Sequence, residues 1–171
     1  MKHLVIPDCQ VKPGQSVKYL ENIGKYIAEK QPEVIVCIGD FADMPSLSSY
    51  DVGKKAFEGR TYKADVNAVH KGMEALLKPV WKLQERQRKA KKRAYNPRMI
   101  LTLGNHEDRI DRAIENDRKL EELISIKDLN YEQYGWEVYD FLDVVVVDGI
   151  AYSHFFASGV MGRPVTSANS L

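Results

Sequence analysis

Short apolar runs alternate with amphipathic stretches along the first two thirds of the chain. Residues 3–7, 34–38 and 99–103 are largely apolar runs of strand length. Residues 15–30 and 62–93 instead place apolar side chains three or four positions apart, which is typical of amphipathic helices. A strand–helix–strand order predicts parallel strands joined by right-handed crossovers. The pattern therefore indicates an α/β fold built on a parallel sheet.

Prolines and a long polar stretch divide these elements. Pro32 is expected to end the first helix. Pro79 predicts a kink or a break in the second helix, because proline removes a helical hydrogen bond. Residues 44–61 lack periodicity and contain proline, serine and glycine, which predicts a long loop at a strand end. After the third strand, residues 108–116 and 119–124 are expected to be helical.

The last part of the chain changes character. Residues 137–141, 144–147 and 150–154 are rich in β-branched and aromatic side chains, which predicts strands. Asp148-Gly149 between the last two runs predicts a tight hairpin, so this part is expected to be antiparallel. Because no repeat or linker divides the sequence, residues 1–171 are expected to form a single domain.

Composition and charge narrow the class of protein. The chain has 171 residues, 29% charged and 44% hydrophobic, and a net charge of +1, which is ordinary for a soluble globular domain. This net charge implies no general attraction to nucleic acid or membranes, so any such attraction must come from a local patch. No apolar run reaches the ~18 residues of a membrane span, and the N-terminus lacks a secretory signal, so a cytoplasmic protein is expected.

Two features leave alternatives open. Cys9 and Cys37 lie near the ends of apolar runs without a CxxC spacing, which favours two reduced, packed thiols over a soft metal ligand or a redox pair. Residues 82–93 carry seven lysines and arginines opposed only by Glu85. This basic segment predicts a solvated helix end or, alternatively, a patch for the phosphate backbone of nucleic acid.

Polar side chains follow the three N-terminal strands. Asp8 comes after the first run, Asp40 after the second, and Asn105 and His106 after the third. Because parallel strands end at one edge of a sheet, these side chains are expected to converge. Such ligands suit divalent ions such as Mn²⁺, Mg²⁺, Fe or Zn²⁺. Two ions about 3.5–4 Å apart can share a carboxylate and activate a bridging hydroxide that attacks a phosphorus ester.

The polar residues form ordered motifs that resemble those of the calcineurin-like metallophosphoesterases, in particular their phage and bacterial branch. The motifs are Asp8-x-Gln10, Gly39-Asp40-x-x-Asp43, Gly104-Asn105-His106-Glu107 and Ser153-His154. The resemblance implies an α/β fold in which two mixed β-sheets form a four-layer αββα sandwich. It also implies a location in the cytoplasm of a bacterium or a phage-infected cell.

The resemblance further implies roles for individual residues. Asp8 and Gln10 ligate the first of two metals. Asp40 bridges the two metals, and Asn105 and His154 ligate the second.

The remaining implied roles concern the substrate. His106 acts beside the scissile ester as a general acid or a cationic stabiliser, and Asp43 holds its tautomer. Glu107 is expected to be a carboxylate in the first turn of a helix rather than a ligand. Candidate phosphate contacts, for which a plain surface charge is the alternative, are Arg109, Arg112 and Arg163.

The chain departs from the family pattern in three places. Gln10 stands where the family commonly has histidine, and its amide oxygen favours Mn²⁺ or Mg²⁺ over Zn²⁺. No histidine follows His154, so the family's closing Gly-His-x-His motif is missing and a C-terminally truncated domain with weakened metal binding is expected. Met44-Pro45 replaces the Arg-Gly of protein Ser/Thr phosphatases, which argues against that activity.

The expected function is therefore metal-dependent hydrolysis of a phosphodiester or a phosphomonoester, with Mn²⁺ as the first choice of metal. The basic segment and the phage and bacterial resemblance favour a nuclease-like enzyme acting on DNA. The near-neutral charge and the single domain favour a phosphatase or phosphodiesterase acting on a nucleotide or another small molecule. The missing motif leaves a further alternative, a catalytically impaired binding module on the same fold.

Overall fold

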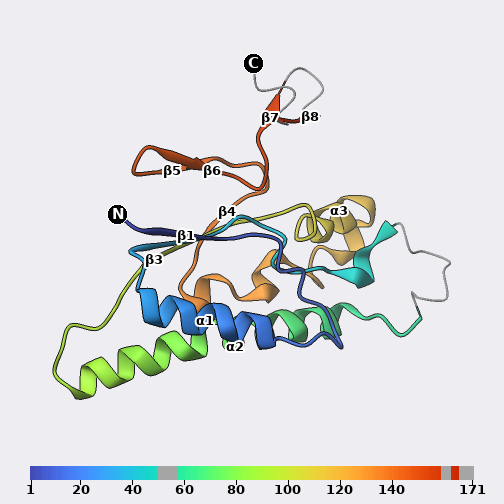
Figure 1. Ribbon diagram of the computed structural model, residues 1–171. Coiled ribbons are helices and arrows are strands. Elements are labelled where there is room, and N and C mark those ends of the chain that lie inside the picture. Colours follow the sequence, from blue (N-terminus) through green and yellow to red (C-terminus); the bar gives the residue numbers. More distant parts are fainter. Residues whose placement is uncertain (50–57, 159–162, 166–171) are drawn as a thin grey trace.

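A parallel β-sheet is the central element of the computed structural model, which describes residues 1–49, 58–158 and 163–165 (Figure 1). In these residues the sheet has the order β1-β2-β3-β4, and each neighbouring pair of strands is parallel. The strands are β1 (His3–Ile6), β2 (Val34–Cys37), β3 (Arg98–Thr102) and β4 (Glu137–Tyr139). The α-helices are α1 (Lys18–Lys30), α2 (Tyr62–Lys89) and α3 (Arg109–Asn116). Short 3₁₀ helices in the loops are η1 (Pro45–Leu47), η4 (Arg118–Leu120), η5 (Ile126–Leu129) and η6 (Glu132–Tyr134).

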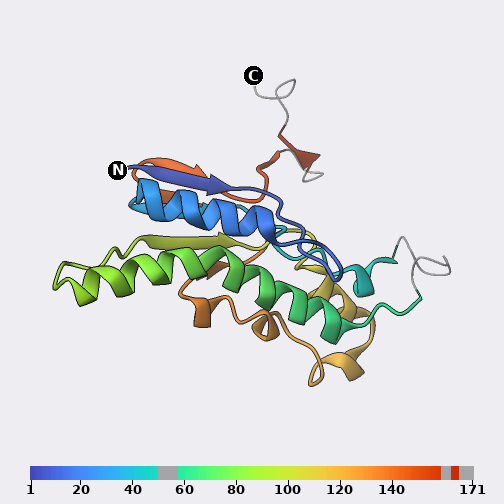
Figure 2. The same cartoon turned by 60° about the horizontal axis from the view of Figure 1, so that its bottom comes forward.

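Helices and a hairpin cover opposite faces of the sheet (Figures 1 and 2). Helices α1 and α2 lie on one face, and the antiparallel hairpin of β5 (Val145–Val147) and β6 (Ile150–Tyr152) lies on the other. Successive side chains of a strand point to opposite faces, so Ile35 and Cys37 join the helix-side core while Val34 and Val36 pack with the hairpin. Both faces of β2 are therefore buried, which explains its continuous apolar sequence.

The helices α1 and α2 pack closely because of Gly24. A Cβ atom at this position would collide with the backbone oxygen of Leu76 and lie 3.1 Å from Cδ of Pro79. Pro79 itself lies inside α2, so the break predicted there is wrong. Buried side chains on both sides of the proline, including Leu76 and Val80, hold the helix against the core and compensate for the missing hydrogen bond.

Most predicted elements are confirmed, with two corrections. The three N-terminal strands and the hairpin at Asp148-Gly149 occur where the pattern placed them. Residues 137–141 were expected to be antiparallel, but β4 pairs in parallel with β3 because the chain from 103 to 136 crosses back over the sheet. Residues 119–124, expected to be helical, are so only at 119–120, which end the 3₁₀ helix η4, and a turn follows. The predicted loop at 44–61 contains η1, and its residues 50–57 lie outside the described part.

The two cysteines confirm the interpretation as packed thiols. Cys9 and Cys37 are both buried and unoxidised. A hydrogen bond with Cys9 and burial together raise the pKa of the Cys37 thiol well above its usual value. A thiol that stays protonated is a poor ligand for a soft metal.

The described residues thus form an α/β fold with a helical layer, a parallel sheet and a small antiparallel hairpin. A further short antiparallel pair joins β7 (Ala157–Ser158) to β8 (Arg163–Pro164). The four-layer sandwich and the single domain over 1–171 stay predictions. Among the described helices, none is both long and apolar enough to cross a membrane.

Candidate metal centre

The loops after β1 and β2 adopt an unusual backbone conformation. Four non-glycine residues in them have positive φ angles: Asp8 (40°), Gln10 (47°), Asp40 (50°) and Met44 (48°). This region costs a non-glycine residue roughly 1 kcal/mol or more. The strain is concentrated at the carboxyl edge of the sheet, where the candidate ligands lie.

Two glycines let these loops approach one another. A Cβ atom at Gly104 would collide with the backbone nitrogen and the side chain of Asp40. A Cβ atom at Gly39 would lie 2.7 Å from Nδ1 of His154, and Gly39 also has a φ of +90° that side chains disfavour. The glycines of both motifs therefore make room for the contact between the strand ends.

This contact brings three candidate ligands together. Single ligand atoms of Asp8, Asp40 and His154 all lie within 4.8 Å of one another. Asp8 follows β1, Asp40 follows β2, and His154 arrives from the opposite face just after β6. Asp40 is 4% exposed and Asp8 is exposed, so the group opens to the surface at one side.

The hydrogen bonds of His154 show that this group fits a cation. Its Nδ1 lies 2.8 Å from the carbonyl oxygen of Ile38 and donates a proton to it. The lone pair of Nε2 then faces Asn105 Oδ1 at 2.9 Å and Asp40 Oδ2 at 3.7 Å. With a proton on Nε2 the contact with Asn105 is a hydrogen bond, and without one the three donors can share a cation. The carboxylate, amide and imidazole set suits a hard or borderline divalent ion.

Gln10 reaches the same edge through its backbone. Its N–H donates to the carbonyl oxygen of Asp40 at 2.8 Å, and its side chain is half-buried. This bond holds the two ligand loops side by side. The role of the Gln10 amide as a metal ligand stays a prediction.

His106 is held beside this group by Asp43. Its Nδ1 lies 2.9 Å from Asp43 Oδ1 and 2.9 Å from the Asp43 carbonyl oxygen. Its Nε2 faces Asp40 Oδ2 at 3.7 Å. The hydrogen bond to Asp43 raises the pKa of His106. The predicted pairing of these two side chains is therefore present in the geometry.

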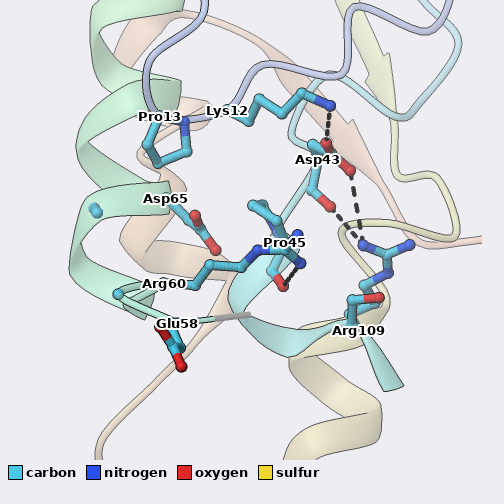
Figure 3. A pocket seen from close by; sticks show the side chains of 11 residues that line it. Lys12, Pro13, Asp43, Pro45, Glu58, Arg60, Asp65 and Arg109 are labelled. Atoms are coloured by element: carbon cyan, nitrogen blue, oxygen red, sulfur yellow. Dashed lines mark hydrogen bonds and ion pairs between the residues drawn. The ribbon is translucent and has the colours of Figure 1, made fainter. Parts of the chain in front are cut away.

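Asp43 in turn contacts two cations, one on each side (Figure 3). Lys12 Nζ donates to Asp43 Oδ2 at 2.8 Å, and Arg109 donates to the Asp43 carbonyl oxygen at 2.8 Å. The hydrogen bond with His106, aided by Lys12, lowers the pKa of Asp43 to about 2. Lys12, Asp43 and Arg109 line a cavity of about 440 Å³, which is also lined by Asp65. A substrate group lying there would be adjacent to His106.

Glu107 has a structural role that the sequence interpretation missed. It lies before α3 rather than in its first turn, and it is fully buried. Its Oε2 accepts from the backbone N–H groups of Asp40 and Gly104, and its Oε1 accepts from Ala42 N–H and the Tyr131 hydroxyl. Burial raises the pKa of Glu107, while the backbone donors oppose that shift. Glu107 therefore joins the second and third ligand loops.

Two of the three arginines predicted to contact phosphate have other partners in the described structure. Arg109 Nη1 donates to backbone carbonyls at 43 and 44, and its Nη2 lies 3.3 Å from His106 Nε2. Arg112 pairs with Asp108 and donates to the carbonyl oxygen of Asn105. Arg163 belongs to β8, and the placement of its side chain lies outside the described part. Of the two whose side chains are described, Arg109 lines the cavity beside His106 and Arg112 does not.

Comparison with known proteins agrees with this geometry. The family described as calcineurin-like phosphoesterase has a sequence model that matches residues 1–166. A comparison with curated proteins finds no match. The matched range includes every predicted ligand.

Proposed function

The chain belongs to the calcineurin-like phosphoesterase family, a family of metal-dependent hydrolases, and we propose that it cleaves phosphodiesters at the carboxyl edge of its parallel sheet. The observation that carries this proposal is the convergence of oxygen and nitrogen ligand atoms from Asp40, Asn105 and His154 at one edge of the sheet. The resemblance to phage and bacterial members of the family favours a diester in DNA as the substrate.

The proposed metal set has two ions, with Mn²⁺ as the preferred metal. Asp8 and Gln10 would hold the first ion, Asn105 and His154 would hold the second, and Asp40 would contribute to both. The amide oxygens at 10 and 105 favour a hard ion over Zn²⁺. When bound, the ions supply positive charge for the phosphate oxygens and lower the pKa of a water that serves as the nucleophile.

His106 delivers the proton in this proposal. Because Nδ1 is held by Asp43, Nε2 is the nitrogen that faces the centre, and it gives its proton to the leaving oxygen. Asp43 keeps the imidazole protonated by raising its pKa, whereas Arg109 opposes that shift by charge repulsion. The acid thus remains charged at a pH above that of an ordinary histidine.

Hydrolysis of bis-p-nitrophenyl phosphate with Mn²⁺ tests the proposal. Asp40→Asn is expected to lower kcat/KM at least 100-fold, on the order of 3 kcal/mol, because the substitution removes a charge shared by two ions. Glu29→Gln, which neutralises an exposed carboxylate in the last turn of α1, before the N-terminal end of β2, is the control and should behave like the parent. Turnover that is independent of metal, or unchanged in Asp40→Asn, would contradict the proposed role of this residue.

A parallel measurement separates the enzyme from a binding module. Metal content is measured after loading with Mn²⁺ and desalting. About two ions per chain together with turnover supports the proposed enzyme. Neither bound metal nor turnover would instead favour a non-catalytic module on the phosphoesterase fold.

A further inference from the structure

Positive charge is concentrated in one segment of this nearly neutral chain. Residues 71–93 contain nine lysines and arginines and two glutamates, a balance of +7 in a chain whose net charge is +1. The remaining residues together therefore carry −6. Local fields of this kind attract polyanions even when the whole molecule is close to neutral.

Part of this charge lines a groove between α1 and α2. The groove has a volume of about 550 Å³ and lies on the helical layer. Its cations are Lys25, Lys71, Lys78, Lys82 and Arg86, and its acids are Glu21 and Glu74. Lys25 is paired with Glu21 at 2.8 Å, so the positive character comes mainly from α2.

The cations of α2 form a regular stripe. Lys78, Lys82 and Arg86 are spaced four residues apart, which puts neighbouring side chains about 6 Å from each other on one helix face. With Lys71 the stripe extends for about 22 Å at 1.5 Å per residue. All four side chains are exposed, and in the described part of the chain none of them has an ion pair within 4 Å.

We infer that this groove binds the phosphate backbone of duplex DNA. A row of cations about 6 Å apart suits a row of phosphates, whereas an acidic small molecule would occupy only one or two of them. Among the described residues, no aromatic side chain lines the groove for base stacking, and Trp81, which lies nearby in α2, stacks on Tyr134 instead. If the groove contacts only the phosphate backbone of the DNA, binding should depend on the salt concentration and not on the base sequence.

The groove begins near the cavity, at Lys71, and its far end at Arg86 is distant from it. Asp65 in α2 lines the cavity beside Asp43, and Arg86 lies 21 residues farther along the same helix, about 32 Å away at 1.5 Å per residue. Only a polymer spans that distance, and about ten base pairs are needed at 3.4 Å each. The inference names DNA as the substrate class of the proposed enzyme, yet the binding itself does not depend on metal or turnover.

The test measures DNA binding without metal. A fluorescent duplex of about 20 base pairs is titrated in EDTA between about 50 and 200 mM salt. For the parent protein, four phosphate contacts predict a slope of log K against log salt of about −3.5. The groove variant carries three substitutions, Lys78→Glu/Lys82→Glu/Arg86→Glu. It should bind at least ~10-fold more weakly and show a flatter slope. The matched control reverses an arginine and two lysines that are exposed outside α2, Arg118→Glu/Lys119→Glu/Lys127→Glu, and should change binding less than ~3-fold.

The outcomes separate this inference from the proposed function. Equal loss of binding in the two triple variants, or a slope near zero, would overturn the groove as the DNA site. Binding to vesicles that contain phosphatidylserine but not to DNA would overturn it in favour of a membrane surface. Bis-p-nitrophenyl phosphate is too small to contact the metal centre and the far end of the groove at once, so the groove variant should hydrolyse it at the parental rate. Failure of catalysis and failure of DNA binding are therefore seen in different assays. Circular dichroism checks that both variants are folded.

Discussion

At the scale of single residues, Asp43 determines the charge state beside the metal centre. Its carboxylate contacts His106 on one side and Lys12 on the other. Its pKa of about 2 lies below the ordinary 3.8, so the interaction stabilises the folded state above pH ~4 and is lost as the pH falls toward 2. In the neutral range, Asp43 therefore remains a carboxylate and acts by holding a proton on His106.

The Asp43→Asn variant is expected to shift the pH dependence of hydrolysis. Without the carboxylate the pKa of His106 falls, so the protonated acid is lost at a lower pH. The alkaline limb of kcat against pH should move to lower pH, with a smaller change in KM. The measurement is a pH profile with bis-p-nitrophenyl phosphate, and His106→Asn should abolish the limb. An unmoved limb in Asp43→Asn would assign the proton transfer to another group.

Glu107 leads to a second prediction at this scale. In Glu107→Gln one carboxylate oxygen becomes an NH₂ group, so at least one buried backbone N–H loses its acceptor whichever oxygen is replaced. The free energy of unfolding should fall by about 2–4 kcal/mol, and Mn²⁺ affinity should fall with it because two ligand loops are released. Urea unfolding measures the first effect. Tyr131→Phe removes a single bond to Glu107 and should cost only about 1 kcal/mol.

The sequence could predict which residues meet here, but not all of their contacts. The pairing of Asp43 with His106 and the nearness of Asp40 to His154 agree with what the family resemblance implied, whereas strand ends alone predicted only that side chains after the three strands converge. Glu107 was expected in a helix because it directly precedes a helical pattern. Its burial depends on a backward turn of the chain at 104–108 and on Tyr131, which no local pattern reveals.

At the scale of elements, the packing of α1 on α2 depends on one glycine. In Gly24→Ala the new methyl group would meet the Leu76 carbonyl oxygen, so the helices must separate locally. This should destabilise the protein by about 1–3 kcal/mol, although alanine favours helix formation by about 1 kcal/mol over glycine. Asn22→Ala, exposed on the same helix, should be neutral or slightly stabilising. Thermal unfolding of the two variants measures the difference, and equal stability would show that the contact can relax.

Elements with buried, continuous or strictly periodic patterns were predictable. β2 is apolar throughout because it is buried on both faces, and α1 and α2 show clear helical spacing. The direction of β4 was not predictable, because its short sequence suits either pairing and only the long connection from β3 decides that it runs parallel. Pro79 did not break α2, since packing on both sides outweighed the local preference.

At the scale of the whole molecule, metal binding and folding are expected to be linked. The candidate ligands come together only in the folded state, so Mn²⁺ should stabilise that state. At about 100 times Kd the gain is about 2.7 kcal/mol, which raises Tm by roughly 5–10 °C for a chain of this size. Differential scanning fluorimetry with and without Mn²⁺ measures this shift. In Asp40→Asn the rise should be much smaller, and an equal rise would place the stabilising ion elsewhere.

The distribution of the ligands along the sequence has a consequence for the order of folding events. Asp8 lies near the N-terminus, whereas His154 arrives only after the last strand of the hairpin. Parallel strands joined by long connections pair slowly, because loop closure must precede their contacts. The donor set therefore exists only after both the sheet and the hairpin have formed. In a refolding experiment, uptake of Mn²⁺ should coincide with the slowest folding phase and thus count the molecules that have reached the native state.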